Sequence, residues 1–364
     1  MRDVLKHAAL HISRSFGLFA LARWLTSDGL RVLAYHGFEL SDETLFRPRL
    51  FIRLPDFARR MEILAKRGYP VLPLGEALDK LTRRELPPSA VAITIDDGFY
   101  AVSAAAAAIL RRFGFPATVY VTTYYAEREA PIFRLVVRYM FERTKADRLD
   151  GTARDWLPGT SVDLKCSAAR NQAAETVIDF GENRCTENER QDICRELGSL
   201  LDVDYDHIRR TRILSLMTGP ELRELAGFGI DVQLHTHRHR FPMDKQMART
   251  EILDNRRALS TLLGGGSFEH FCYPSGKYSS SQWPWLVELG VKSATTCEPG
   301  LNYPGTPRFG IHRFLDDSEV SSITFEAELS GFLELARRGR ARMRRRLADR
   351  PPKSSHEPGR AEQS

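Results

Sequence analysis

The sequence lacks the cysteine patterns that build disulfide frameworks or thiolate zinc sites. Its five cysteines are an odd number, and no two of them form a C-x-x-C pair. They are Cys166, Cys185, Cys194, Cys272 and Cys297. Because unpaired cysteines are typical of a reducing compartment, we expect a cytoplasmic protein, with the inner face of the membrane as an additional location.

The N-terminal region lacks a hydrophobic run long enough to cross a membrane. Only eight uncharged residues separate Arg14 from Arg23, and no small-residue cleavage site follows. Residues 1–30 instead carry apolar side chains at helical spacing, which predicts an amphipathic helix. The apolar stripe consists of Leu5, Ala9, Ile12, Phe16 and Phe19, and the residues off it include Arg2, His7, His11 and Arg14. We expect this helix to dock on the body of the protein, with a membrane surface as the alternative.

Excess charge is absent from most of the chain, although the formal net charge is +6. Residues 337–364 hold 10 basic and 3 acidic residues, which leaves 43 basic and 44 acidic residues elsewhere. A nearly neutral body gives no reason to expect nucleic-acid binding. The basic segment 337–364 is expected to be a disordered tail, which either contacts anionic lipid or sugar or has no partner.

Short apolar runs alternate with helical patterns between residues 31 and 330. The expected strands are 31–35, 71–74, 91–95, 117–122, 230–234, 271–273, 292–296 and 309–314, and the expected helices are 56–66, 101–113, 220–226 and 244–263. Residues 127–208 interrupt the alternation and are expected to form an insertion, with helical patterns at 132–141 and 187–201 around a loop-like middle. The alternation predicts a mainly parallel sheet that closes as a (β/α) barrel.

The strand expected at 91–95 ends in two adjacent carboxylates and a glycine, Asp96, Asp97 and Gly98. Because glycine permits the backbone to turn, both carboxylates can approach one site, one of them binding a cation and the other acting as a base. The alternative is a simple turn in which one aspartate caps the helix expected at 101–113. This motif alone does not decide between the two.

Three of the ten histidines fall within the segment His235-Thr-His-Arg-His239, directly after the strand expected at 230–234. Two imidazoles four residues apart, together with one carboxylate, form a donor set that suits Zn²⁺ and leaves a coordination position open. The alternative is a solvated loop that binds metal only incidentally. We favour the metal site because α/β barrels place their active sites at the carboxyl ends of strands.

The two motifs together resemble those of the polysaccharide deacetylases, the NodB-like family of chitin, peptidoglycan and exopolysaccharide deacetylases. Thr94-Ile-Asp-Asp-Gly98 is similar to the family motif T-F-D-D-G, and the segment from His235 to His239 is similar to H-[ST]-x-x-H. The resemblance implies a distorted TIM-like (β/α) barrel over residues 31–330, including the mostly helical insertion 127–208. It also implies a metal-dependent hydrolase that removes N-acetyl groups from an amino-sugar polysaccharide or a lipid-linked sugar.

The resemblance further implies a role for each motif residue. Asp96 is the general base, and Thr236 braces its loop. Asp97, His235 and His239 hold the metal. Their donor set leads us to expect Zn²⁺, with Co²⁺, Ni²⁺ or Mn²⁺ as alternatives. Two other functions stay open on the same barrel: hydrolysis of a non-sugar linear amide, and sugar binding without catalysis. The expected partner is an N-acetylated polysaccharide or lipid-linked sugar, and peripheral contact with a membrane is an additional expectation.

The sequence departs from the family where the remaining roles should lie. Phe271-Cys-Tyr-Pro-Ser-Gly276 resembles the third motif of the exopolysaccharide enzymes but lacks the arginine that often orients the base. Arg313 could supply this cation or form a surface salt bridge, and its neighbour His312 could be the catalytic acid. Since adjacent strand residues point to opposite faces, only one of the two should face the site, and we favour Arg313.

Two residues could contact the substrate or the oxyanion. Tyr273 belongs to the third motif. His36 follows the strand expected at 31–35, and a structural histidine is its alternative role.

Overall fold

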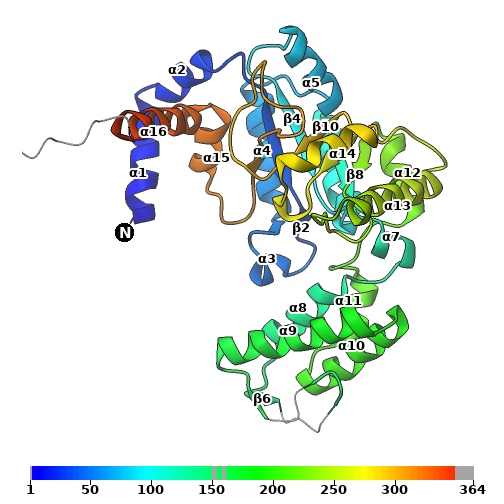
Figure 1. Cartoon of the computed structure of the whole chain (residues 1–364). Coiled ribbons are helices and arrows are strands. Elements are labelled where there is room, and N and C mark those ends of the chain that lie inside the picture. The colour runs from blue at the N-terminus through cyan, green and yellow to red at the C-terminus, as the bar shows by residue number, and fades with distance from the viewer. Residues whose placement is uncertain (1, 150–153, 158–160, 349–364) are drawn as a thin grey trace, which may run out of the picture.

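The computed structural model describes residues 2–149, 154–157 and 161–348 of the 364-residue chain. Figure 1 shows a central α/β barrel, a helical insertion below it in green, and a bundle of helices from both ends of the chain at the left. No helix among these residues is long and apolar enough to span a membrane.

A seven-stranded parallel sheet forms the centre of the molecule, as predicted. In spatial order its strands are β10(Ser293–Thr295), β9(His270–Cys272), β8(Asp231–Leu234), β5(Thr118–Val121), β4(Val91–Ile95), β1(Arg31–Tyr35) and β11(Phe314–Leu315). The segment 308–316 joins the first and last strands of this order. Ile311 forms a bridge to Thr295 at the end of β10, and Phe314 in β11 pairs with Leu33 in β1. The sheet therefore curls into a barrel whose carboxyl strand ends lie on one rim.

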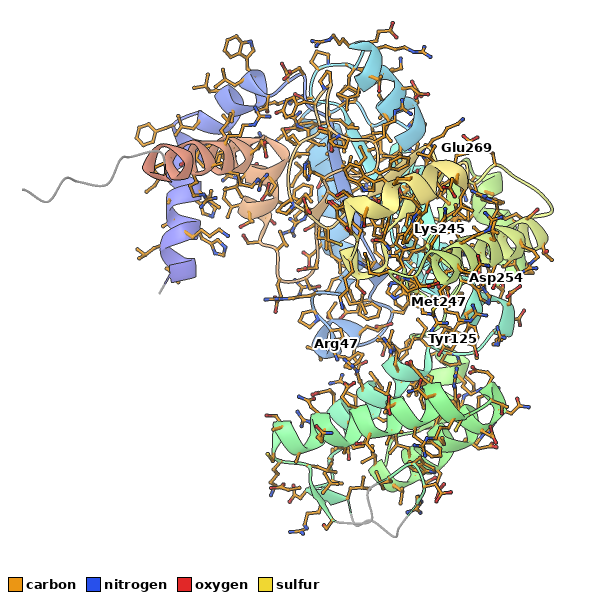
Figure 2. All side chains as sticks on the ribbon, viewed as in Figure 1. Arg47, Tyr125, Lys245, Met247, Asp254 and Glu269 are labelled. Carbon is orange, nitrogen blue, oxygen red and sulfur yellow. The ribbon has the colours of Figure 1, made fainter. Side chains whose placement is uncertain are left out.

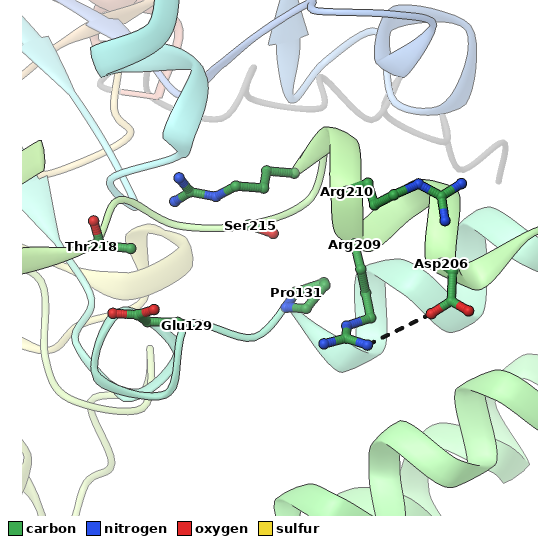
Figure 3. Close-up of a pocket in the computed structure, with 8 residues that line it drawn as sticks. Glu129, Pro131, Asp206, Arg209, Arg210, Ser215 and Thr218 are labelled. Carbon is green, nitrogen blue, oxygen red and sulfur yellow. Dashed lines mark ion pairs between the residues drawn. The ribbon is translucent and has the colours of Figure 1, made fainter.

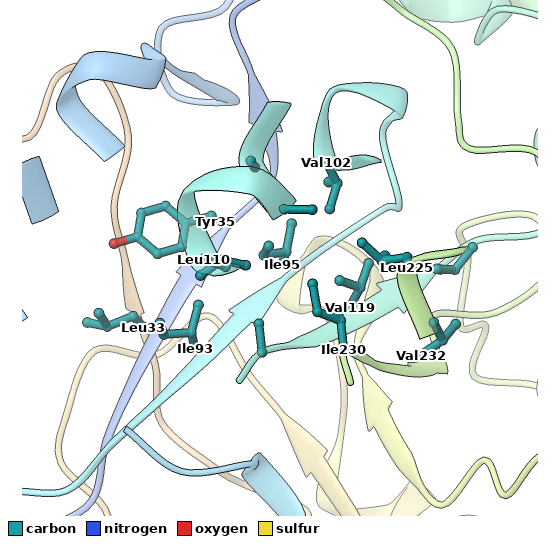
Figure 4. Close-up of a cluster of buried hydrophobic side chains, with 14 of the residues drawn as sticks. Leu33, Tyr35, Ile93, Ile95, Val102, Leu110, Val119, Leu225, Ile230 and Val232 are labelled. Atoms are coloured by element: carbon teal, nitrogen blue, oxygen red, sulfur yellow. The ribbon is translucent and has the colours of Figure 1, made fainter. Parts of the chain in front are cut away.

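Successive residues of the central strands β1, β4 and β5 point into two different hydrophobic clusters. Leu33, Ile93 and Val119 pack against the surrounding helices (Figure 4). Val32, Ala92 and Tyr120, one position earlier or later, belong to a second cluster that includes side chains of α5(Leu74–Arg83). Strands that are buried on both faces read as continuous apolar runs, which explains why the sequence predicts β1 and β4 so well.

The helices around the sheet begin and end close to the predicted residues. They are α4(Leu54–Lys66), the π-helical turn η1(Val102–Ala106) leading into α6(Ala107–Phe113), α12(Gly219–Gly227) and α13(Lys245–Leu263). The short α14(Trp283–Glu288) has no predicted counterpart. Thr218 and Glu221 form a capping box at the start of α12. Asp244 caps α13 by accepting a hydrogen bond from the Met247 N–H at 2.8 Å, and Gly264 ends it at φ 76°.

Two expected strands are wrong in extent. At 71–74 the structure has a single bridge from Val71 to Val91, and α5 already begins at Leu74. Pro70 and Pro73 flank this bridge and have no N–H to extend a ladder. At 309–314 only the last residue is in a strand, because a turn closed by the Gly310 N–H to the Pro307 carbonyl precedes it.

The insertion is more helical than expected. Its elements are α7(Tyr124–Arg128), α8(Phe133–Arg143), β6(Arg148–Leu149), β7(Val162–Asp163), α9(Ser167–Arg184), α10(Glu187–Leu201) and α11(Tyr205–Thr211). The prediction of a loop-like middle is wrong, since α9 occupies 18 residues there. The buried face of α9 consists largely of small residues such as Ala173, Ala174 and Gly181, so its apolar periodicity is weak in the sequence.

Short elements that follow β1 pack against the insertion. They are β2(Gly37–Phe38), α3(Glu43–Phe46) and β3(Phe51–Ile52). The rings of Phe46 on α3 and Tyr139 on α8 meet edge to face, with centroids 5.5 Å apart. Figure 2 shows Arg47 and Tyr125 on the side of the barrel that faces the insertion.

The terminal helices differ from expectation in two ways. The N-terminal region forms two helices, α1(Arg2–Ser15) and α2(Leu18–Leu25), separated at Gly17 with φ 73°. They pack with α15(Ser322–Leu329) and α16(Phe332–Ala348). The prediction of disorder from residue 337 is wrong as far as Ala348, because α16 continues through these residues and Arg337 pairs with Glu328. The rest of the predicted tail, 349–364, lies outside the described residues.

Candidate active site

Asp96 and Asp97 lie at the end of β4, where the backbone changes conformation. Asp96 continues the strand's alternation and points to the same side as Ala92 and Thr94. Asp97 has φ 68° and Gly98 has φ 84°, so the chain turns immediately after Asp96. This left-handed turn places Asp97 beside the histidines of the β8 loop, although a regular strand would direct it away from Asp96.

A buried arginine holds Asp96. Arg313 Nη1 donates to Asp96 Oδ1 at 2.7 Å, and its Nη2 donates to Oδ2 at 2.8 Å. Arg313 is fully buried and also donates to the Thr296 carbonyl and Thr94 Oγ1. Burial raises the pKa of Asp96, but Arg313 and the nearby His36 outweigh this effect and hold that pKa at about 2. The Asp96 carboxylate is therefore ionised and fixed in orientation.

Cys272, at the end of β9, is a neighbour of this pair that the sequence does not single out. Its Sγ lies 3.4 Å from Asp96 Oδ2 and 3.2 Å from Arg313 Nη2. A small apolar residue within a buried strand has no sequence signal that separates it from ordinary core. Its position in the third motif, where the family often has an arginine, is the one hint.

Asp97, His235 and His239 converge on one point. Asp97 Oδ1 lies 3.2 Å from His235 Nε2 and 3.3 Å from His239 Nε2. Ligand atoms bound tetrahedrally at zinc–nitrogen lengths are about 3.4 Å apart, so these spacings fit a shared cation. The pKa of Asp97 is well below its usual value, because the two histidines outweigh the effect of burial.

Hydrogen bonds fix the histidine loop behind the donor atoms. His235 Nδ1 donates to the Cys272 carbonyl at 2.9 Å, which leaves the Nε2 lone pair free to face a metal. Thr236 and His239 both have positive φ, and Thr236 Oγ1 accepts a hydrogen bond from the Arg240 N–H across the loop. The side chains of Asn255 and Glu251 on α13 accept from the backbone of this loop as well.

A second group, Asp96, His235 and Cys272, also brings three potential ligand atoms together. Both oxygens of Asp96 are already engaged by Arg313. Cys272 Sγ lies 3.2 Å from Arg313 Nη2, so a cation bound to this sulfur would be held against a buried guanidinium. Asp97, His235 and His239 are therefore the better donor set.

The other three residues singled out from the sequence have different surroundings. His36, after β1, lies close to the site, with its Nε2 3.6 Å from Asp96 Oδ2. Tyr273 is buried, and its hydroxyl donates to the Phe309 carbonyl at 3.0 Å. Its N–H donates to the Thr295 carbonyl, so both of its donors are engaged within the protein. His312 lies elsewhere, with its Nδ1 3.7 Å from Glu298.

The orientation of His312 and Arg313 follows from Asn302. Its side chain accepts from the His312 N–H at 2.8 Å and donates to the His312 carbonyl at 2.9 Å. These two bonds fix the backbone of His312, and the next residue, Arg313, then enters the barrel. The structure thus places Arg313, not His312, against the carboxylates.

A cavity of about 370 Å³ lies between the insertion and the barrel and does not include these carboxylates (Figure 3). Its lining contains three arginines, Arg209, Arg210 and Arg212, which pair with Asp206, Asp204 and Glu221 respectively. A separate site lies at the carboxyl ends of β4 and β8 and consists of Asp96, Asp97, His235 and His239. The side chains of His239 and of the adjacent His36 are partly exposed.

Comparison with known proteins agrees with this geometry. The model of the polysaccharide deacetylase family matches residues 83–143 and 206–294, which carry Asp96, Asp97, His235 and His239. Among curated proteins, none is significantly similar to the chain in sequence.

Several solved structures share the fold. The Streptococcus pyogenes deacetylase PplD, in complex with acetate, is 16% identical, with 83% of this chain and 98% of that chain covered and a TM-score of 0.54. IcaB from Ammonifex degensii is 18% identical over 83% and 97% of the two chains, with a TM-score of 0.51. A de-N-acetylase from Aggregatibacter actinomycetemcomitans is 14% identical over 82% and 99%, with a TM-score of 0.52. With this fold and both motifs inside the matched segments, the chain carries a polysaccharide deacetylase domain.

Proposed function

We propose that this protein is a metal-dependent deacetylase that removes N-acetyl groups from an amino-sugar polysaccharide or a lipid-linked sugar. The observation that carries the proposal is a carboxylate held ionised by a buried arginine, Asp96 with Arg313, beside a three-atom donor set. The two nitrogens and one oxygen of this set favour Zn²⁺.

Each residue has a defined task in this proposal. A divalent cation held by Asp97, His235 and His239 would polarise the acetamide carbonyl and lower the pKa of water. Asp96 accepts the proton of the water that attacks the acetamide carbon, and Arg313 keeps it ionised and aimed. His36 is the histidine outside the donor set that lies near Asp96, so it is placed to carry a proton to the departing amine. The products are acetate and a free amino sugar.

The test is incubation of the zinc-loaded protein with N-acetylated oligosaccharides, followed by mass spectrometry and acetate detection. We expect products that have lost acetyl groups. Release of acid from simple linear amides, with acetylated sugars left intact, would instead support the amide hydrolase. Sugar binding by calorimetry without turnover would support a non-catalytic relative.

Arg313 and His312 should behave differently when each is replaced by alanine. Loss of Arg313 removes the cation beside Asp96 and raises the pKa of that carboxyl, so the acidic limb of the pH–rate profile should move to higher pH. We expect turnover to fall about 10- to 100-fold, the usual effect of losing a residue that orients a site. His312→Ala should change neither quantity, because its ring lies beside Glu298 and not beside the carboxylates.

Because Arg313 is buried, its replacement could also disturb folding. Arg313→Lys keeps the charge but loses the paired hydrogen bonds, so it should restore the acidic limb with only part of the turnover. Melting curves of all three proteins separate this effect from unfolding. A larger loss of turnover in His312→Ala than in Arg313→Ala would contradict the assignment.

A further inference from the structure

Most of the exposed large hydrophobic side chains gather on the N-terminal helices. Eight of the fifteen in the described chain lie between residues 4 and 25. They are Val4, Leu5, Ile12, Phe16, Leu18, Leu21, Trp24 and Leu25, which we call the N-terminal apolar face. Figure 1 shows α1 and α2 at the edge of the molecule, away from the insertion. An exposed apolar group of this size on a folded domain indicates a surface that binds something.

The way α1 docks leaves this face uncovered. The sequence predicts that the stripe containing Leu5, Ile12 and Phe16 packs on the body of the protein. The structure shows α1 docked through its other side, where Leu10 is 4% exposed and Arg14 Nη1 donates to Glu326 Oε1 at 2.9 Å. Phe16 is 79% exposed, so the predicted contact face is wrong for α1.

The next helix repeats the arrangement. Phe19 of α2 is buried in a small cluster with Leu10, Ile323 and Ala327, and Ala22 is buried as well. On the other side of α2, Trp24 is 69% exposed and Leu21 is about half exposed. Each helix thus has a docked side within the protein and a second apolar side in solvent. An amphipathic helix that lies on a bilayer has an apolar side of this kind, which it buries among the lipids.

Exposed basic residues lie on the same helices as the apolar face and on a helix packed against them. Lys6 and His11 are exposed on α1, and Arg338 and Arg340 are exposed on α16, which packs against α2. The sequence of α16 contains seven arginines and one glutamate. Apolar side chains beside an excess of cations are complementary to a bilayer that contains anionic lipids.

We propose that the N-terminal apolar face, together with the exposed Lys6, Arg338 and Arg340, docks this protein on the surface of an anionic lipid bilayer. A second copy of the chain fits less well, because self-association would bring the same arginines close together. A polyanionic sugar would engage the arginines but would leave Phe16 and Trp24 in water.

The test is co-sedimentation of the full-length protein with lipid vesicles. We expect binding to vesicles of phosphatidylcholine with phosphatidylglycerol, and much weaker binding to phosphatidylcholine alone. The double variant Phe16→Ser/Trp24→Ser should bind the anionic vesicles at least about tenfold more weakly, given the apolar area lost. Leu45→Ser is the matched control, because Leu45 is 75% exposed but lies on α3, outside this face.

Three further measurements decide the outcome. Melting temperatures and turnover of a soluble substrate should be unchanged in both variants, since the replaced side chains are exposed and belong neither to the donor set nor to the Asp96–Arg313 pair. Equal vesicle binding by wild type and double variant, or equal binding to both lipid mixtures, would overturn the proposal. A dimer in light scattering that the double variant dissociates, without vesicle binding, would show that the face binds a second copy instead.

Discussion

The Asp96→Asn protein is expected to retain its metal, and its deacetylation rate is expected to fall by a factor of about 10²–10⁴. This factor is the usual contribution of a general base. Asparagine has nearly the same shape as aspartate but cannot accept a proton from water at neutral pH. Both Asp96 oxygens face Arg313, not the three donor atoms, which is why the metal should stay. The rate is measured under saturating zinc and the metal content by elemental analysis.

Asp316→Asn is the matched control for this variant. Asp316 follows β11, is buried, and pairs with the buried Arg60 at 3.0 Å, so it repeats the aspartate–arginine pair outside the site. Its replacement should lower the melting temperature without changing turnover per folded molecule. Loss of metal from Asp96→Asn would show that Asp96 is a ligand and that the roles of the two aspartates are reversed.

Replacement of any one of Asp97, His235 or His239 by alanine should remove most of the bound metal. A three-ligand site has little affinity left when one ligand is lost, and activity should fall with metal content. The wild-type protein should bind about one Zn²⁺-class ion per chain. Metal content after dialysis, measured by elemental analysis, checks each protein.

Two further variants make this experiment specific. His237→Ala should keep the metal, because the Nδ1 of His237 hydrogen-bonds to Thr123 Oγ1 at 2.9 Å and the residue belongs to neither donor group. Cys272→Ala should keep it too, since Cys272 does not belong to the donor set of Asp97, His235 and His239. Stoichiometric metal in the doubly substituted His235→Ala/His239→Ala protein would rule out this site, and loss from Cys272→Ala alone would indicate the second donor group.

The secondary structure near the site could be read from local sequence. β1 and β4 have the predicted ends, and α12 and α13 begin within one residue of the predicted starts at 220 and 244, after the caps Thr218 and Asp244. The signals are local, because a buried strand needs a continuous apolar run and a helix start needs a side chain that accepts from its first N–H groups. α9 escaped prediction because alanine and glycine give little apolar contrast.

The site was predictable as a set of residues but not as a geometry. Asp96, Asp97, His235 and His239 stand out because carboxylates and imidazoles follow directly on buried strands, and the structure brings their side chains together. Their catalytic and ligand roles stay predictions. The positive φ of Asp97 and the thiol of Cys272 beside Asp96 have no comparable signal in the sequence.

The sequence by itself determined the strand and helix order, the parallel sheet and the residues available for chemistry, because each depends on neighbours within a few positions. Only the tertiary structure decided which side of an element faces which partner. Asn302 directs Arg313 inward through its bonds to His312, and Glu326, 312 residues from Arg14, selects the docked side of α1. Both side-chain orientations are set by partners distant in sequence, and a local periodicity contains no information about those partners.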